Sequence, residues 1–349
     1  MSSLREFVDK LNCTDEAERT FAAEDIGYWN TPDGVPPLLE RLGHESSLAV
    51  RSAVFQALLR IDGDVAVEGC IRLLGSDDPQ IRNQAVDVLR RKGPRSIPFL
   101  NTLMGDVDKD LRKLVLDVLA GIQSAEVAEI YAKALSDEDP NVVITAVENL
   151  GKIRAREFRS RIEDLLQAGS HPMLVTACVE ALVGIGHETS LLAIRRRFSD
   201  LATLPDFFLA SCLKAIAAFG YAKEFAEVAS LLPLRAAHLR PAMLSALIAI
   251  CPRCPSLEPP EGFLPALQAV VDGEDPALCR YQAVRVLGNW AIRDDVGTFL
   301  VSSLSSTERL VRLGAAESLR MAERPGWGTL LAARALEEDD QEVLQALGC

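Results

Sequence analysis

Two histidine–glutamate pairs are the first residues in this chain that could do chemistry. His44-Glu45 and His187-Glu188 each place an imidazole beside a carboxylate, and both groups are common metal ligands. They are few, because the chain has only four histidines and only two such pairs. Both pairs are expected in turns, where turn or helix-capping roles are favoured over metal ligation.

A Cys-x-x-Cys motif at Cys251 and Cys254 has the spacing of metal and redox sites. A tetrahedral zinc site would need two more ligands, and neither a second such pair nor a nearby histidine pair follows. The nearest candidates, His238 and Cys279, are expected on different helices. The motif therefore favours a proline-rich loop with incidental thiols, while metal binding or redox activity of these two cysteines stays open.

Other catalytic signatures cannot be picked out of the sequence. It has no Gly-rich phosphate loop, nucleophile elbow or cluster of catalytic carboxylates. None of the histidines stands in a motif for acid–base catalysis. The sequence therefore predicts a protein that is not an enzyme and that holds no cofactor.

The elements that position these residues belong to an internal repeat. A leucine or isoleucine anchor recurs with a mean spacing of about 33 residues, in the range of two-helix repeats. The residues three and four positions before each anchor are all apolar, and those three after it nearly all are. These offsets share one side of a helix, so they predict the buried stripe of a second helix in each repeat. The anchors are Ile26, Leu58, Leu89, Leu119, Leu150, Leu182, Ile216, Leu247, Leu287 and Leu319.

Further apolar segments alternate with these stripes and predict the first helix of each repeat. An Asp-Pro step such as Asp78-Pro79 or Asp275-Pro276 predicts a helix that starts at the proline. Residues 4–11 predict an opening helix. The expected first helices are 35–42, 65–74, 97–104, 127–135, 158–166, 191–198, 225–232, 263–271, 296–304 and 330–336.

The repeat resembles the HEAT repeat, in particular the subtype named after phycobilisome lyases. The resemblance rests on a pattern like Asp-Pro-x-Val-Arg-x-x-Ala-x-x-Ala-Leu-Gly-x-Ile, seen from Asp78 to Leu89 and from Asp139 to Ile153. It implies an all-α, right-handed α-solenoid of about ten two-helix repeats. Such repeats serve scaffolds, adaptors and a few enzymes, so the resemblance says more about fold than about function.

An arginine seven residues before the anchor points toward the buried stripe, where an unpaired charge would be costly. The resemblance implies a structural ladder in which turn carboxylates such as Asp78 or Asp108 pair with it. Val143, Val175 and Leu209 replace the arginine, so the ladder should break there. Its members are Arg19, Arg51, Arg82, Arg112, Arg240, Arg280 and Arg312.

The same resemblance bears on the histidine pairs. Deoxyhypusine hydroxylases carry iron on His-Glu pairs that directly follow the repeat arginine, whereas here that position holds residues such as Ser52-Ala53.

The spacing between repeat anchors lengthens after Leu247, in a segment that contains four prolines. Residues 1–250 are thus expected to form eight repeats, 251–262 an insertion loop, and 263–349 the C-terminal repeats with a terminal half-repeat.

The residue two positions before the anchor points away from the stripe, on the side that lines the concave face in this family. Four successive carboxylates there predict an acidic strip, with Lys214 and Arg285 changing its sign further on. The alternative is a merely solvated helix face. The predicted partner-binding residues are Asp87, Asp117, Glu148, Glu180, Lys214 and Arg285.

The composition of the chain indicates which classes of binding partner are favoured. Asp plus Glu number 50 against 37 Lys plus Arg, a formal charge of −13, which argues against nucleic-acid binding and favours a basic protein segment. Apolar runs are short and broken by charges, the N-terminus lacks a signal-peptide stretch, and eight cysteines are spread along the chain. We therefore expect a cytoplasmic scaffold or adaptor without membrane insertion. The alternative is a bilin-lyase-like or other cofactor-handling protein that acts on an acceptor protein.

Overall fold

The computed structural model describes residues 4–322 and 324–348, and every regular element in these ranges is helical. The chain divides into two compact units, one ending at Phe158 and the other beginning at Arg159. The loop 251–262 lies within the second unit. Nowhere in the described ranges does a helix combine the length and the apolar character needed to span a membrane.

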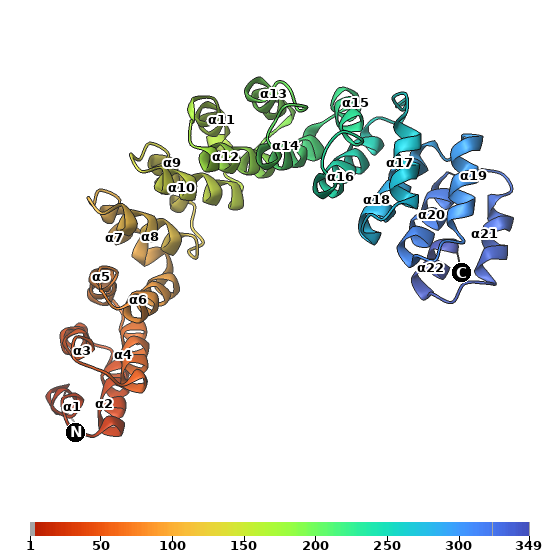
Figure 1. The fold of residues 1–349 in the computed structure, drawn as a ribbon. Coiled ribbons are helices and arrows are strands. Elements are labelled where there is room, and N and C mark those ends of the chain that lie inside the picture. The colour runs from red at the N-terminus through yellow and green to blue at the C-terminus, as the bar shows by residue number, and fades with distance from the viewer. Residues whose placement is uncertain (1–3, 323, 349) are drawn as a thin grey trace. The chain divides into compact units, whose positions relative to one another are not determined.

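The first unit is a stack of helix pairs. The even-numbered helices form one layer and pack in sequence order, and the odd-numbered helices form the other (Figure 1). Its helices are α1 (Leu4–Leu11), α2 (Glu16–Trp29), α3 (Val35–Leu42), α4 (Leu48–Arg60), α5 (Asp64–Leu73), α6 (Pro79–Lys92), α7 (Ile97–Leu103), α8 (Lys109–Leu119), α9 (Glu126–Ala134) and α10 (Pro140–Lys152), with short 3-10 turns at Pro32–Gly34, Gly93–Ser96 and Arg156–Phe158.

The second unit repeats this two-layer arrangement (Figure 1). Its helices are α11 (Arg159–Ala168), α12 (Pro172–Ile185), α13 (Glu188–Arg197), α14 (Asp206–Phe219), α15 (Ala222–Leu231), α16 (Arg240–Ile250), α17 (Phe263–Asp272), α18 (Ala277–Leu287), α19 (Asp294–Ser303), α20 (Arg309–Met321), α21 (Trp327–Ala335) and α22 (Gln341–Leu347), with 3-10 turns at Ala237–Leu239, Cys251–Arg253 and Gly288–Trp290. The predicted all-α solenoid of helix pairs is confirmed.

The core of each unit is the stripe that the repeat predicts. Every anchor from Ile26 to Leu287 is fully buried, and Leu319 is 1% exposed. The position three residues after the anchor differs, because Trp29 and Ile153 are nearly half exposed. Trp29 is the last residue of α2 and Ile153 follows α10, so no further turn of either helix covers them.

Side chains in the turns start several second helices. Asp78 caps α6 by accepting a hydrogen bond from the Gln80 backbone N–H at 2.8 Å, and α6 begins at the proline that follows Asp78. The prediction of the same start for α18 is wrong by one residue, because Pro276 is its N-cap and α18 begins at Ala277. The carboxylate of Asp275 instead accepts two hydrogen bonds from Arg240.

Close packing of α2 on α4 depends on a glycine. A Cβ atom on Gly27 would lie 2.7 Å from the Ala57 Cα and 2.9 Å from its Cβ. Because backbone cannot move aside as a flexible side chain does, Gly27→Ala is expected to lower the free energy of unfolding by about 1–3 kcal/mol. Denaturant titration followed by circular dichroism measures this loss.

The matched control for that substitution is Gly328→Ala in α21, where no atom lies within 4 Å of the added Cβ. Helix propensity alone then predicts a stabilisation of up to about 1 kcal/mol. An equal gain from Gly27→Ala would show that α2 and α4 are not packed this closely.

Candidate functional site

The residues two positions before each anchor lie on the solvent face of the even-numbered helices, which we call the second-helix face. All of them are exposed or half-exposed. Asp87, Asp117 and Glu148 stand on α6, α8 and α10 of the first unit. Glu180, Lys214 and Arg285 stand on α12, α14 and α18 of the second.

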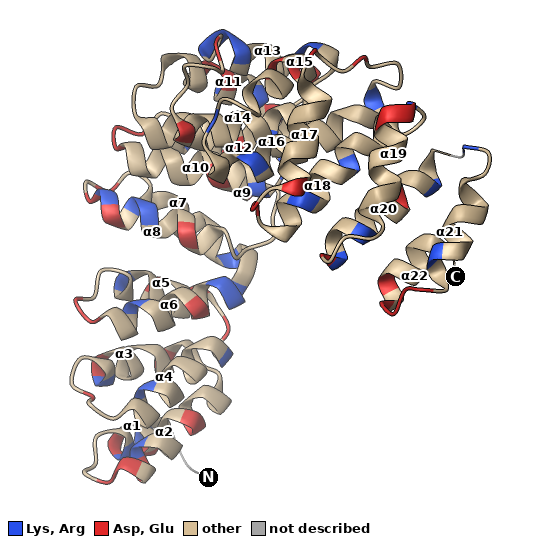
Figure 2. Ribbon diagram, turned by 45° about the vertical axis from the view of Figure 1, so that its right-hand side comes forward, with Lys and Arg blue, Asp and Glu red and all other residues tan. Residues whose placement is uncertain are grey.

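In the first unit, each of these carboxylates already has a cation in its own helix. Lys113 Nζ lies 2.9 Å from Asp117 Oδ2, Arg91 Nη1 lies 3.8 Å from Asp87 Oδ2, and a lysine at 4.0 Å accompanies Glu148. The first unit therefore presents both positive and negative charges on this face, and Figure 2 shows blue and red segments together along α6 and α8. Exposed pairs of this kind contribute only about 0.3–0.5 kcal/mol each, so an incoming charge can exchange with them.

A groove of about 500 Å³ lies on this face between α8 and α10. Asp117 and Glu148 line opposite sides of it with their lysines. Polar side chains held by helix carbonyls complete the wall: Asn149 Nδ2 donates to Thr145 O at 2.8 Å. The lining residues are Arg90, Lys113, Asp117, Ala120, Asn141, Ile144, Thr145, Glu148, Asn149 and Lys152.

In the second unit the charges join neighbouring second helices. Lys214 Nζ on α14 lies 2.6 Å from Glu180 Oε1 on α12. Arg285 on α18 lies 2.6 Å from Glu317 on α20, whose carboxylate also accepts a hydrogen bond from the Tyr281 hydroxyl at 2.9 Å. The cations therefore neutralise the carboxylates beside them.

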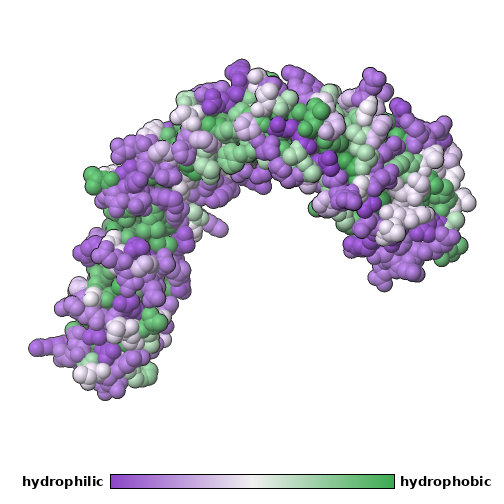
Figure 3. Space-filling view, in the orientation of Figure 1, coloured by the Kyte–Doolittle hydropathy of each residue, from purple (hydrophilic) through white to green (hydrophobic). Residues whose placement is uncertain are grey.

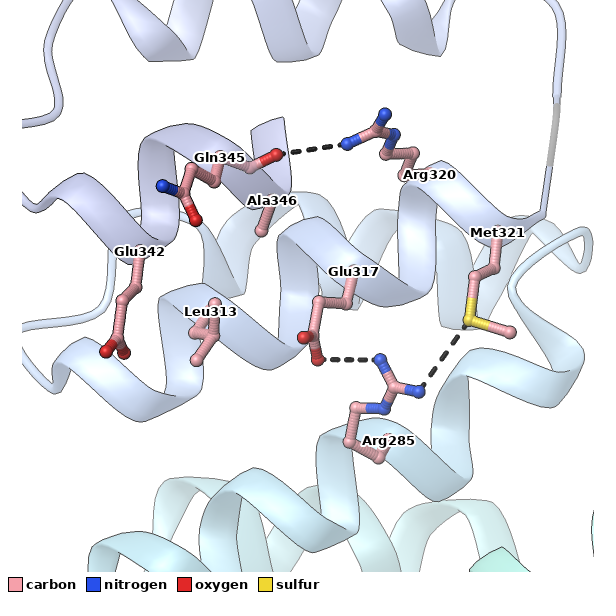
Figure 4. A pocket seen from close by; sticks show the side chains of 8 residues that line it. All are labelled: Arg285, Leu313, Glu317, Arg320, Met321, Glu342, Gln345 and Ala346. Carbon is pink, nitrogen blue, oxygen red and sulfur yellow. Dashed lines mark hydrogen bonds and ion pairs between the residues drawn. The ribbon is translucent and has the colours of Figure 1, made fainter. Parts of the chain in front are cut away.

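A second groove, of about 730 Å³, lies where α18, α20 and α22 meet (Figure 4). Arg285 bridges Glu317 and the Met321 sulfur, and Arg320 Nη1 donates to Gln345 O at 3.0 Å. Its lining combines apolar side chains with charges of both signs, which suits a peptide rather than a small charged ligand. The lining residues are Arg285, Leu313, Glu317, Arg320, Met321, Glu342, Gln345 and Ala346.

The repeat arginine reaches forward to the turn of the next repeat. Arg51 Nη1 lies 2.8 Å from Asp78 Oδ2, and Arg112 donates two hydrogen bonds of 2.8 and 2.7 Å to Asp137. Each contact ties two neighbouring repeats together. The other arginines with such a contact are Arg19 to Glu45, Arg240 to Asp275 and Arg312 to Glu338.

Two arginines of the same register lack this contact. Within residues 4–322 and 324–348, Arg82 and Arg280 pair with no carboxylate and donate to backbone carbonyls, Ser76 O and Val271 O, at 2.6 Å. At the positions where the arginine is replaced, Val143, Val175 and Leu209 are buried. There the first-helix layer is linked instead, because Arg195 on α13 lies 2.6 Å from Glu227 on α15.

Glu45 is the most buried charge in the first unit, at 2% exposed. Its carboxylate accepts hydrogen bonds from Arg19 Nε at 2.9 Å, Arg41 Nε at 2.8 Å and the Ser47 backbone N–H at 2.8 Å. Burial raises the pKa of Glu45, but these donors outweigh it and lower the pKa from 4.5 to about 2. His44 beside it is exposed in the turn, so the pair is split between solvent and interior.

The other candidates for chemistry are dispersed. His187 is the N-cap of α13, and its backbone N–H donates to Ser190 Oγ. Burial raises the pKa of the Cys251 thiol to about 12, which disfavours a reactive thiolate. Among the described residues, no three His, Cys, Asp or Glu side chains come together in a way that could hold a metal ion.

Two features of the structure were not predicted from the sequence. One is the buried Glu45 network, which no local pattern marks as buried. The other is the solvent face of α2, where Phe21 and Tyr28 are 64% and 70% exposed. Their separation of seven residues was the available signal, because it places both rings on one side of a helix.

Comparison with known proteins agrees with this geometry. A family model described as HEAT repeats matches residues 4–90 and 97–183. A structure of Kap95p, described as inducing the switch loops of RanGDP to adopt the GTP-bound conformation, superposes with a TM-score of 0.64 at 12% identity, over 99% of this chain and 56% of that one. Kap121p superposes with a TM-score of 0.55 at 13% identity, over 99% and 44%.

The chain therefore spans about half the length of these two solved structures. At such identities the likeness extends to the fold alone. No curated protein matches the sequence. The family match in the N-terminal half and the stacked helix pairs of each unit identify the chain as a HEAT-repeat protein.

Proposed function

We propose that this chain is a non-enzymatic, cytoplasmic scaffold or adaptor that binds a protein segment along its second-helix face. The observation that carries the proposal is the pair of grooves on that face, one in each unit, each lined by charges of both signs together with polar and apolar side chains. A groove lined in this way suits the varied side chains of a peptide better than it suits a phosphate group or a metal ion. The solenoid-like Kap95p contacts a protein, RanGDP, which supports the same use of the fold here.

The proposed contacts are those of the second-helix face. Asp117 and Glu148 would exchange their helix lysines for cations of a basic segment, and Asp87 and Glu180 would extend the contact. Lys214 and Arg285 would meet acidic groups of the same partner. Rim charges of this kind set encounter rate and selectivity, and apolar contacts supply most of the affinity.

A photocrosslinking side chain introduced at Asn141, inside the first groove, tests the proposal. In a lysate of the source organism, illumination should join this variant to a discrete protein identified by mass spectrometry. The matched control places the crosslinker at Glu129, which is exposed on α9 in the first-helix layer. Equal products at both positions, or none at Asn141, would contradict the proposal.

Charge reversal then tests the electrostatic part. With the captured partner, Asp117→Lys/Glu148→Lys should slow association about tenfold at low salt and flatten its salt dependence. Glu126→Lys/Glu129→Lys on α9 makes the same change of net charge and should leave the rate within about twofold.

The finer family assignment, to the phycobilisome-lyase-like subtype, remains part of this proposal. A visible absorption band in the purified protein would favour the cofactor-handling alternative over a scaffold.

A further inference from the structure

Helix α2 exposes the two least covered aromatic rings among the described residues. Phe21 is 64% and Tyr28 is 70% exposed, and Trp29 beside them is 46% exposed. The chain is only 5% aromatic. In the second unit, the exposed rings Phe207 and Tyr221 reach only 49% and 42%. Large exposed rings gathered on one helix mark an interaction surface more often than chance solvent exposure.

The two rings share one side of α2. They are seven residues apart, so they lie about 20° apart around the helix and about two turns apart along it. Ala22 and Ile26 fill the buried side of the same helix. Replacing either ring therefore leaves the core unchanged. The space-filling view shows pale and green atoms among the hydrophilic surface of the first unit (Figure 3).

Carboxylates flank the rings on both sides. At 100° per residue, Glu24 lies on one side of the Phe21–Tyr28 line, and Asp25 and Glu18 lie on the other. None of the three forms an ion pair with a cation within residues 4–322 and 324–348, whereas Asp87, on the second-helix face of α6, does. An incoming cation would therefore meet carboxylates on α2 that no ion pair engages within those ranges, which favours this face over the paired carboxylate of α6.

The chain itself shows how a cation fits here. The guanidinium of Arg60, at the end of α4, lies 4.3 Å from the centroid of the Tyr28 ring. This is a cation–π contact, and Tyr28 stays 70% exposed with Arg60 in place. A planar guanidinium can stack on a ring and donate to a neighbouring carboxylate at the same time, which an ammonium group does less well.

We propose that the solvent face of α2, formed by Phe21 and Tyr28 between Glu18, Glu24 and Asp25, binds an arginine-containing segment of a protein partner. The rings stack on guanidinium groups, and the carboxylates accept their hydrogen bonds. The inference rests on the proposed scaffold function and deepens it by assigning the partner's chemistry. It concerns a part of the second-helix face that lies outside both grooves, so the two can fail separately.

Fluorescence anisotropy with a labelled peptide of five Arg-Gly repeats tests this binding at low salt. The Lys-Gly peptide should bind several-fold more weakly, and a Glu-Gly peptide should not bind. Phe21→Ala/Tyr28→Ala should weaken Arg-Gly binding about tenfold, and Glu24→Gln/Asp25→Asn should weaken it to a similar extent. Circular dichroism tests whether each variant is folded. If Phe21→Ala/Tyr28→Ala is not folded, the binding of Glu24→Gln/Asp25→Asn decides the test.

Matched controls separate this site from the general attraction between a cationic peptide and a chain of charge −13. Glu126→Gln/Glu129→Gln removes two exposed charges from α9 in the first-helix layer of the same unit, and Phe207→Ala removes an exposed ring from the second unit. Both should bind the Arg-Gly peptide as the unchanged protein does.

Three results would overturn the inference. The first is unchanged binding by both α2 variants, and the second is an equal loss of binding in the Glu126→Gln/Glu129→Gln control. The third is a dimer in sedimentation that Phe21→Ala/Tyr28→Ala abolishes, because the face would then join two copies of this chain. Crosslinking at Asn141 is independent of all three, so the scaffold function would stand or fall by that measurement.

Discussion

Glu45→Gln is expected to lower the free energy of unfolding of the first unit by about 3–5 kcal/mol, because it leaves two guanidinium groups without their shared anion. The Glu45 side chain is 1% exposed, and those of Arg19 and Arg41 are 11% and 17% exposed. Water cannot replace the lost carboxylate at such depth. Denaturant titration of the variant measures the loss.

The control for this substitution is Glu6→Gln in α1. Glu6 pairs with Lys10 at 3.7 Å, and both side chains are about half exposed. Removing an exposed pair within one helix should cost no more than about 0.5 kcal/mol. Equal small losses in the two variants would show that Glu45 is solvated in solution.

The same network predicts how stability depends on pH. The pKa of Glu45 is lowered from 4.5 to about 2 in the folded chain, so the unfolded chain binds the proton more readily. Its contribution is fully present above pH 4.5 and is lost as the pH falls toward 2. At about 1.4 kcal/mol per pKa unit, the contribution is about 3.5 kcal/mol. In Glu45→Gln this part of the acid dependence should vanish.

Arg112→Ala is the second substitution with a large expected effect, a loss of about 3–5 kcal/mol. The side chains of Arg112 and Asp137 are 5% and 9% exposed, so the variant leaves a buried carboxylate unpaired. It also removes the donor that Asp106 O accepts at 2.8 Å. The hydrogen bond from Arg112 lowers the pKa of Asp137, so its share of stability is present at neutral pH and is lost in acid.

A double-mutant cycle separates the pair from its surroundings. Arg112→Leu/Asp137→Leu should cost less than the sum of its single variants, because an apolar pair leaves no charge uncompensated. Arg82→Ala is the matched control, since Arg82 contacts a backbone carbonyl and should cost about 0.5–1.5 kcal/mol. Additive single losses would contradict the coupling between Arg112 and Asp137.

The repeat arginines show where sequence reasoning stops. Their register and their need for an acceptor follow from spacing and from the cost of burying a charge. The choice of acceptor does not: Arg51 reaches Asp78, while Arg82 donates to the Ser76 backbone carbonyl and not to Asp108, which caps α8. Whether an arginine meets a carboxylate or a carbonyl depends on how the neighbouring repeat packs against it.

The second-helix face shows the same limit. The exposure of Asp117 and Glu148 could be predicted from the helical period alone. Their lysine partners four residues away are equally visible in the sequence, and the i,i+4 spacing predicts the pairs that the structure contains. That the face is hollowed between α8 and α10 depends on how far apart two helices settle, which the volumes of all the packed side chains set together.

By itself, the sequence determined the helices, their order and their buried sides. These depend on interactions within a few residues: the caps of Asp78 and its counterparts, and the apolar period around anchors such as Leu89. Only the tertiary structure decided that Glu45 is buried and that Arg60 of α4 reaches the ring of Tyr28 on α2. Burial of a side chain is set by neighbours from other helices, and a residue's type and spacing do not specify whether such a neighbour is there to cover it.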